Sequence, residues 1–343
     1  MKALVLHKVR DLRVDERPEP KPGPGQVLVR VRAVGLCGSD VHYYTHGRIG
    51  DQVVERPMIV GHEGAGEVAE LGPGVAGPPV GTRVAIEPAC SCGRCEYCTT
   101  GRPNICPTVR FASTPPHDGL MCEFAPVEAH QCKPIPEGLS FDEAAMLEPL
   151  QVAVHTVNLV GVRPDDTVAV VGVGCIGLGC MEAARVAGAG RIFVVDKLDY
   201  RLALAKRLGA DEAVNNARED PLAFLSKRTG GRLADLAVDC TNKAAGAPLA
   251  YSLAGVGGRV ALVGIPEEDE IVLDAHVPRR KELTIQHIRR SRHAFTQAVD
   301  LVASKRLDVA SWVTHRVGLD EARHAFDLVA EYADGILKAV VLP

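Results

Sequence analysis

Four cysteines between residues 92 and 106 have the spacing of a metal-binding loop. Two residues separate Cys92 from Cys95 and Cys95 from Cys98, and seven residues separate Cys98 from Cys106. Four thiolates at this spacing can close around one tetrahedral zinc ion. Cysteines can also form disulfides or pack as small hydrophobic residues, so the compartment of the protein bears on their role.

The start of the chain and its hydropathy favour metal over disulfides. The sequence begins Met-Lys-Ala without an apolar leader, and it has no apolar stretch of about 18 residues that could span a membrane. We therefore expect a cytoplasmic protein without membrane contact, and disulfides are rare in that compartment. The four cysteines are predicted to hold a structural zinc ion.

A second set of metal-ligand types lies in the same half of the chain. Cys37, His62 and Glu63 offer a thiol, an imidazole and a carboxylate. Catalytic zinc takes three such ligands and keeps one position open. A lone cysteine or histidine is more often a packing residue, so this prediction gains weight only from what the rest of the chain binds.

Gly172, Gly174 and Gly177 form the G-x-G-x-x-G pattern of a dinucleotide-binding loop. The pattern follows the apolar run 167–171 and opens a predicted helix at 175–187. The N–H groups and the dipole of such a helix attract a pyrophosphate. The glycines at 72, 74 and 77 repeat the pattern, but two prolines follow them, and proline supplies no N–H group.

Asp196 lies nineteen residues after Gly177, at the end of the next predicted strand. A carboxylate at that position accepts hydrogen bonds from the adenine ribose hydroxyls and repels a 2′-phosphate, which favours NAD over NADP. Lys197 and Arg201 lie nearby and weaken this preference, because cations attract a phosphate.

The hydrophobic pattern predicts an α/β protein in which two kinds of unit carry these sites. Residues 1–150 alternate short apolar runs with Pro and Gly, which predicts a β-rich unit with strands near 27–33, 64–70 and 83–86. Residues 151–285 alternate strand and helix patterns, which predicts a parallel sheet with strands near 167–171, 191–195, 234–238 and 258–263. The alternation loosens over 286–343, where we expect the chain to return to the first unit.

The composition narrows the classes of function. A length of 343 residues suggests two domains, and a hydrophobic content of 46% is enough to build their cores. The net charge of −4 provides no basic field for nucleic acid or anionic membrane. A zinc module that binds nucleic acid or protein is a competing hypothesis for the cysteine loop, but no basic helix flanks that loop.

The order of these motifs resembles the zinc-dependent medium-chain dehydrogenases over essentially the whole chain. The motifs that carry the resemblance are Cys37-x-Ser39-x-x-His42, Gly61-His62-Glu63, the four cysteines, Glu148-Pro149 and the glycine pattern. Segments similar to the sorbitol (polyol) dehydrogenase branch are 42–44, 47–51, 114–119, 148–150 and 313–316. The resemblance implies a GroES-like catalytic domain at 1–150, a doubly wound Rossmann NAD-binding domain at 151–285, a return to the catalytic domain at 286–343, and a homotetramer.

The resemblance also implies roles for residues at matching positions. Cys37, His62 and Glu63 would hold the catalytic zinc, and Glu148 would ligate it directly or through water. Asp40 would orient the histidine ligand, although a simple turn aspartate is an alternative role. Ser39 and His42 match a relay that carries the alcohol proton to solvent. The implied cofactor-binding residues are Gly172, Gly174, Ile176, Gly177, Asp196, Arg201, Val263 and Ile265.

The substrate pocket of the polyol branch is matched in part. Tyr43 and Phe111 match two pocket positions, and Arg290 matches a third, but Ser291 stands where the branch has a tyrosine. This difference puts sorbitol itself in doubt and leaves polyols as the expected substrates. Animal sorbitol dehydrogenases lack the second zinc, whereas this chain keeps all four cysteines, as many bacterial relatives do.

The predicted function is the reversible oxidation of a secondary alcohol of a sorbitol- or xylitol-like polyol to a ketose. It would use NAD and two zinc ions per subunit, one catalytic and one structural. The alternatives are a relative acting on a diol or on L-threonine, and a zinc-free quinone reductase of the same fold. The presence of the Cys37, His62 and Glu63 set argues against the quinone reductase.

Overall fold

The computed structural model describes residues 1–343 and divides them into two compact units. The first unit comprises Met1–Glu148, Ala298–Lys305 and Val309–Pro343, and the second comprises Pro149–Gln297 and Arg306–Asp308. The chain leaves the second unit after Gln297 and returns to it for Arg306–Asp308, and the strand Thr284–His287 belongs to the second sheet. None of the helices is long and apolar enough to cross a membrane.

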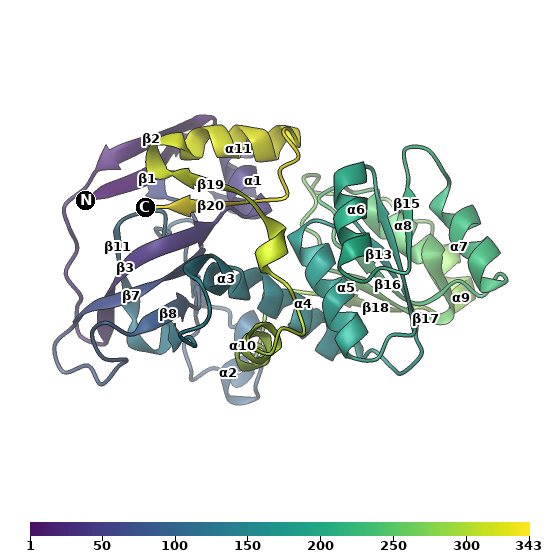
Figure 1. Cartoon of the computed structure of the whole chain (residues 1–343), viewed down its shortest axis with the longest axis horizontal. Coiled ribbons are helices and arrows are strands. Elements are labelled where there is room, and N and C mark those ends of the chain that lie inside the picture. Colours follow the sequence, from purple (N-terminus) through teal and green to yellow (C-terminus); the bar gives the residue numbers. More distant parts are fainter. The chain divides into compact units, whose positions relative to one another are not determined.

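The first unit is built on a seven-stranded sheet (Figure 1). Its path is β12-β8-β7-β3-β20-β19, and β11 pairs with β3. The bounds are β3 Gln26–Gly35, β7 Glu63–Leu71, β8 Arg83–Ile86, β11 Phe124–Glu128, β12 Cys132–Pro134, β19 Val313–Gly318 and β20 Lys338–Leu342. The last two strands come from the C-terminal segment, and antiparallel pairing of β20 with β3 brings the end of the chain to the middle of the sheet.

Smaller elements surround this sheet. A three-stranded sheet has the order β2-β1-β6, and two-stranded pairs are formed by β4 with β5 and by β9 with β10. Their bounds are β1 Lys2–Lys8, β2 Asp11–Glu16, β4 Arg48–Ile49, β5 Gln52–Val53, β6 Met58–Ile59, β9 Ala89–Cys90 and β10 Arg110–Phe111. The helices are α1 Gly38–His46, α2 Glu96–Thr99, α3 Phe141–Ala145 and α11 Ala322–Glu331, with 3₁₀ turns at Pro103–Ile105, Ala129–Gln131, Ala310–Trp312 and Leu319–Glu321. Two further helices, α4 Leu147–Val160 and α10 Phe295–Ala303, contain residues at which the chain passes between the units.

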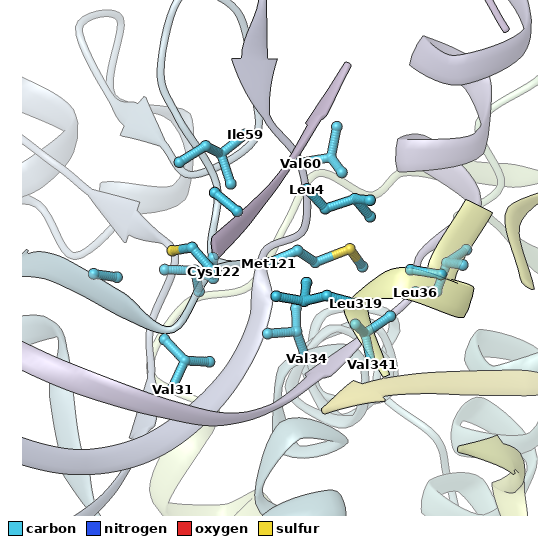
Figure 2. Packing of buried hydrophobic residues seen from close by; sticks show 14 of the residues in the cluster. Leu4, Val31, Val34, Leu36, Ile59, Val60, Met121, Cys122, Leu319 and Val341 are labelled. Atoms are coloured by element: carbon cyan, nitrogen blue, oxygen red, sulfur yellow. The ribbon is translucent and has the colours of Figure 1, made fainter. Parts of the chain in front are cut away.

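The core of the first unit consists mainly of aliphatic side chains, with Tyr43, Tyr44 and Phe326 as its aromatic members. Strand β3 places buried residues on both of its faces, because other elements cover the sheet on either side. Figure 2 shows Met121 among Leu4, Val34, Leu319 and Val341, which come from opposite ends of the sequence. This packing fixes β3 and the residues that follow it, where the first predicted metal ligand lies.

The second unit is a six-stranded, fully parallel sheet (Figure 1). Its order is β15-β14-β13-β16-β17-β18, which is the doubly wound order. In such sheets ligands bind at the carboxyl ends of the strands, where the strand order reverses next to the first strand, here β13. The strands are β13 Thr167–Val171, β14 Arg191–Asp196, β15 Glu212–Asn215, β16 Ala234–Asp239, β17 Ala254–Leu262 and β18 Thr284–His287. The helices are α5 Cys175–Val186, α6 Asp199–Arg207, α7 Pro221–Thr229, α8 Gly246–Leu253 and α9 His276–Lys281.

The predicted fold class is confirmed. The strand expected at 167–171 is β13, and that at 191–195 is β14 extended by Asp196. Val168 and Val170 are fully buried, as expected for a strand covered on both faces.

Candidate metal and nucleotide sites

Cys37, His62 and Glu63 meet in the first unit, with their ligand atoms all within 4.8 Å of one another. Cys37 follows β3 and caps α1, whereas Glu63 begins β7. The antiparallel register places Glu63 opposite Gly35, two residues before Cys37. Strand pairing therefore brings the three residues together from two separate stretches of sequence.

Gly35 keeps the space that the Glu63 carboxylate occupies. A Cβ atom at residue 35 would overlap Glu63 Oε2 and would lie 2.7 Å from Met146 Cε. The methionine end is flexible, but Glu63 is only 1% exposed and has little room to move. Glycine at this position is required by the close approach of a side chain.

Asp40 fixes the orientation of His62. Asp40 Oδ2 lies 3.3 Å from His62 Nδ1, which leaves the Nε2 nitrogen of the ring to act as a ligand. The carboxylate is completely buried, and burial alone would raise its pKa. The charge of His62 and hydrogen bonds from His62, Ser113 and the Gly61 N–H outweigh burial and lower the pKa of Asp40, so the group stays a carboxylate.

Lys338, at the start of β20, binds the third ligand residue. Its Nζ lies 2.8 Å and 2.7 Å from the two carboxylate oxygens of Glu63 and donates to the Leu36 carbonyl at 3.1 Å. Both side chains are buried. Lys338 belongs to no sequence motif, and its only signal in the sequence is that a lysine opens an otherwise apolar C-terminal strand.

Glu148 lies close to this group without belonging to it. Its carboxylate is not among the ligand atoms that gather within 4.8 Å. Burial first, and then the nearby Glu63 and Glu87, raise the pKa of Glu148 to about 8 against the opposing effects of the His62 and Lys338 charges. Coordination of a metal by Glu148, directly or through water, therefore stays a prediction.

The three clustered residues fit zinc on chemical grounds. A thiol, an imidazole and a carboxylate are the common zinc donors, and three of them leave a fourth tetrahedral position. The Asp40–His62 contact supplies the carboxylate partner that zinc-bound histidines usually have. The Phe111 ring packs against the His62 ring with centroids 5.4 Å apart and covers it with an apolar surface.

The predicted relay and pocket residues of α1 lie immediately after Cys37 in the chain. Ser39 is half-buried, and His42 lies one turn further along the helix and is buried. His42 faces the exposed His46 one turn later, with ring centroids 6.0 Å apart. The Tyr43 hydroxyl donates to Gln52 Oε1 at 3.2 Å, which ties α1 to β5.

Cys92, Cys95, Cys98 and Cys106 form the second group of ligand atoms within 4.8 Å. The pairing of β9 with β10 closes the base of the loop that carries them. All eleven cysteines are free thiols, and backbone N–H groups of Arg94 and Cys95 lower the pKa of Cys92 to about 6. Against the opposing bond from the Cys98 N–H, burial and hydrogen bonds with the neighbouring sulfurs raise the pKa of Cys95 to about 11, so the fit to structural zinc rests on the four-sulfur donor set.

The glycine pattern lies where β13 turns into α5 in the second unit. Gly172 adopts a φ of 82°, a conformation that favours glycine, and Gly174 caps the helix. A Cβ at Gly177 would overlap the Gly172 carbonyl oxygen, whereas at Gly174 the only atom within 4 Å is Arg201 Nη1, at 3.8 Å. The loop thus has tight internal packing and open space at its middle glycine, which fits a pyrophosphate.

Asp196 ends β14 beside this loop and is buried. Its Oδ2 accepts from the Val173 N–H at 2.9 Å and its Oδ1 from the Leu198 N–H at 3.0 Å. The carboxylate therefore also holds the glycine loop against the end of the strand, a role that the sequence did not reveal. Its location fits the adenosine ribose of a dinucleotide.

The remaining predicted residues lie in the second unit. Val263 and Ile265 follow the carboxyl end of β17, and the Val263 N–H donates to the Asp239 carbonyl at 2.9 Å. Ile176 is half-buried in the first turn of α5. Arg290 follows β18 with a φ of 55°, and because it belongs to the second unit its part in a substrate pocket stays a prediction.

Comparisons with known proteins agree with this architecture. Residues 23–137 match the model of the alcohol dehydrogenase GroES-like domain, and residues 175–304 match that of zinc-binding dehydrogenase. Sorbitol dehydrogenase of Bacillus subtilis (strain 168) is 38% identical over 343 residues, which cover 100% of this chain and 97% of that protein. Sorbitol dehydrogenase of Gallus gallus is 40% identical over 327 residues, 95% of this chain and 92% of that protein.

A solved structure extends the agreement to three dimensions. The structure of an E. coli CFT073 protein described as a short chain alcohol dehydrogenase, complexed with NADH, matches with a TM-score of 0.91 at 30% identity. The match covers 100% of this chain and 99% of that chain. Together with the two clusters of metal ligands and the dinucleotide loop, these matches establish that the chain belongs to the zinc-dependent medium-chain dehydrogenase family.

Proposed function

We propose that the protein oxidises a secondary alcohol of a polyol to a ketose, reversibly and with NAD. The main supporting observation is the buried cluster of Cys37, His62 and Glu63 with its two supporting charges, Asp40 and Lys338. The full-length similarity to sorbitol dehydrogenases supports the polyol class of substrate. In this proposal the first unit, which includes the C-terminal return, is the catalytic domain, and the second unit binds the coenzyme.

Two bound groups supply chemistry that side chains lack. Zinc held by Cys37, His62 and Glu63 would act as the Lewis acid that makes an alcohol easier to deprotonate. NAD held at the glycine loop and Asp196 would accept the hydride. A second zinc at Cys92, Cys95, Cys98 and Cys106 would stabilise its loop.

The protein's own residues prepare the metal site and move the proton. Asp40 keeps a proton on His62 Nδ1, so that Nε2 presents its lone pair to the metal. Lys338 holds both oxygens of Glu63 and offsets its buried charge. The Ser39 hydroxyl would receive the alcohol proton and His42 would pass it on, and the contact of the His42 ring with the exposed His46 ring provides a direction toward solvent.

Substrate selection is assigned to the side chains around this cluster. Phe111 lies against the His62 ring, and Tyr43 is held by Gln52, so both have fixed positions. Glu148 would act as a further carboxylate at the metal, and a role for Arg290 of the second unit is supported only by the family resemblance. Polyols suit such a site because several hydroxyl groups can each find a fixed polar partner.

Asp196 supports NAD as the coenzyme. Its buried carboxylate at the end of β14 would accept from the ribose hydroxyls and repel a 2′-phosphate. Arg201, whose Nη1 lies 3.8 Å from where a Cβ of residue 174 would stand, would contact the pyrophosphate. Lys197 lies beside Asp196 and would reduce the strictness of the preference.

We also propose a cytoplasmic homotetramer. The edge strand β18 is exposed at all four residues, and an exposed edge strand offers backbone groups for pairing with a second copy. Exposed apolar residues of the same unit, Val256 and Val272, are suited to burial between subunits. The four-cysteine loop would support further contacts between subunits, and sedimentation of the zinc-loaded protein would measure the oligomeric state.

A substrate panel tests the function. NADH absorbance is followed with pentitols, hexitols, tetritols, diols and L-threonine, and metal content is measured on the same sample. The proposal expects two zinc ions per subunit and the highest kcat/KM with a polyol. Preference for a diol or for L-threonine would overturn the polyol assignment, and full activity with zinc only in the four-cysteine loop would overturn the metal mechanism.

A further inference from the structure

Ser113 makes two hydrogen bonds beneath the metal-binding cluster. Its hydroxyl donates to Asp40 Oδ1 at 2.6 Å and accepts from the Gly61 N–H at 2.9 Å. The residue is 2% exposed, so water does not compete for these bonds. Both partners lead directly to His62, because Asp40 contacts its ring and Gly61 precedes it in the chain.

The two oxygens of Asp40 have separate tasks. Oδ2 faces His62 Nδ1 and accepts from the Cys37 N–H at 3.3 Å, whereas Oδ1 accepts from Ser113 and from the Gly61 N–H at 3.1 Å. Rotation of the carboxyl group would take Oδ2 away from the imidazole. The bonds to Oδ1 oppose that rotation, and the bond from Ser113 is the shortest of them.

The backbone at Ser113 shows that the side chain matters. Its φ is 59°, in the left-handed region that favours glycine and that other residues occupy only where their surroundings hold them. Glycine would adopt this turn without strain but would supply no hydroxyl. A serine in a conformation suited to glycine is explained by the two bonds that its hydroxyl makes.

We propose that Ser113 is a positioning residue of the metal site, holding His62 in its ligand orientation through Asp40 and Gly61. The inference rests on the zinc site of the proposed function and is independent of the substrate. Groups in this supporting position usually change metal affinity by about 10- to 100-fold when they are removed.

The test measures metal release from the zinc-loaded protein. Ser113→Ala removes the hydroxyl and keeps the strained backbone, whereas Ser113→Gly removes the hydroxyl and relieves the strain. A chelator assay resolves release from the two zinc sites, and Cys37→Ser identifies the phase that belongs to the catalytic site. Ser140→Ala is the matched control, because its hydroxyl caps α3 and donates to Glu143 Oε2 at 2.6 Å in the same unit.

We expect both Ser113 variants to release catalytic zinc about tenfold faster, with the four-cysteine phase unchanged. The kcat should fall while the KM for NAD stays constant, and Ser140→Ala should lower the melting temperature without changing zinc release. Wild-type release in Ser113→Gly would overturn the proposal, because it would assign Ser113 to the turn alone. Unchanged zinc release in both variants would also overturn the proposal. Zinc release is measured without substrate, so the test remains valid even if the polyol assignment fails.

Discussion

Lys338 and Glu63, 275 residues apart in the sequence, form a buried ion pair inside the metal-binding cluster of the first unit. Their side chains are 5% and 1% exposed, so water solvates neither charge. Parallel pairing of β19 with β20, and antiparallel pairing of β20 with β3, carries the lysine to this place. The C-terminal return of the chain thus completes a site whose ligands lie within the first 63 residues.

Lys338→Met should destabilise the metal-free protein more than the zinc-loaded protein. Without the lysine and without zinc, Glu63 would be a buried charge that has lost its hydrogen-bonded cation, which costs about 3–5 kcal/mol. Zinc would supply the missing positive charge. Urea unfolding with and without a chelator measures the difference.

A double mutant separates charge from packing at this pair. Lys338→Met combined with Glu63→Gln removes both charges and should recover much of the stability lost in the metal-free single mutant. Equal losses in the single and double mutants would instead assign the effect of Lys338 to packing.

Gly35→Ala should reduce the zinc content to about one ion per subunit and abolish turnover. The new Cβ would displace the Glu63 carboxylate, which the ion pair with Lys338 prevents from adapting. Gly38→Ala is the control, since a Cβ there meets no atom within 4 Å. Metal analysis of the two variants checks this, and equal zinc content in both would contradict the steric argument.

Cys98→Ser should unfold or loosen the four-cysteine loop before it affects the chemistry. Three sulfurs hold zinc less tightly than four, and the short helix α2 lies within the loop. A lower melting temperature or a smaller oligomer with a conserved kcat per intact subunit is the expected result. Loss of kcat in a fully assembled protein would contradict a structural role.

Asp196→Ala should weaken NAD binding much more than NADP binding. The variant loses the acceptor for the ribose hydroxyls and also the bond from the Val173 N–H that holds the glycine loop. Loosening of the loop would affect both coenzymes, whereas loss of the carboxylate charge favours NADP. The ratio of the two dissociation constants, measured by nucleotide fluorescence, isolates the second effect, and an unchanged ratio would defeat the NAD assignment.

Two of the predicted groups of residues depend on local spacing alone. Cys92 to Cys106 form one loop, and Gly172 to Gly177 form one turn, so each motif carries its own geometry. The cluster of Cys37, His62 and Glu63 was predicted from residue type and family order, although its geometry depends on the β3–β7 register. Lys338 and Ser113 were missed because only tertiary pairing brings them to the metal site, and neither has a local pattern.

The pH dependence of stability should reveal His155, a buried histidine of α4 in the second unit. Burial first, and then the charge of Arg292, lower its pKa to about 4, well below the ordinary value of 6.5. Between about pH 6.5 and pH 4 the unfolded chain therefore binds a proton that the folded protein does not. Above pH 6.5 this group does not affect stability, and as the pH drops through this window the folded protein loses up to about 3 kcal/mol of unfolding free energy.

His155→Gln should flatten the dependence of unfolding free energy on pH within that window, because glutamine binds no proton in either state. Arg292→Ala should flatten it in part, since it removes one of the two causes of the lowered pKa. Urea unfolding of the wild type and both variants at intervals between pH 8 and pH 4.5 gives the three slopes. Because other groups titrate in all three proteins, the informative quantity is the difference between slopes, and a His155→Gln slope equal to that of the wild type would show that the folded protein protonates His155 normally.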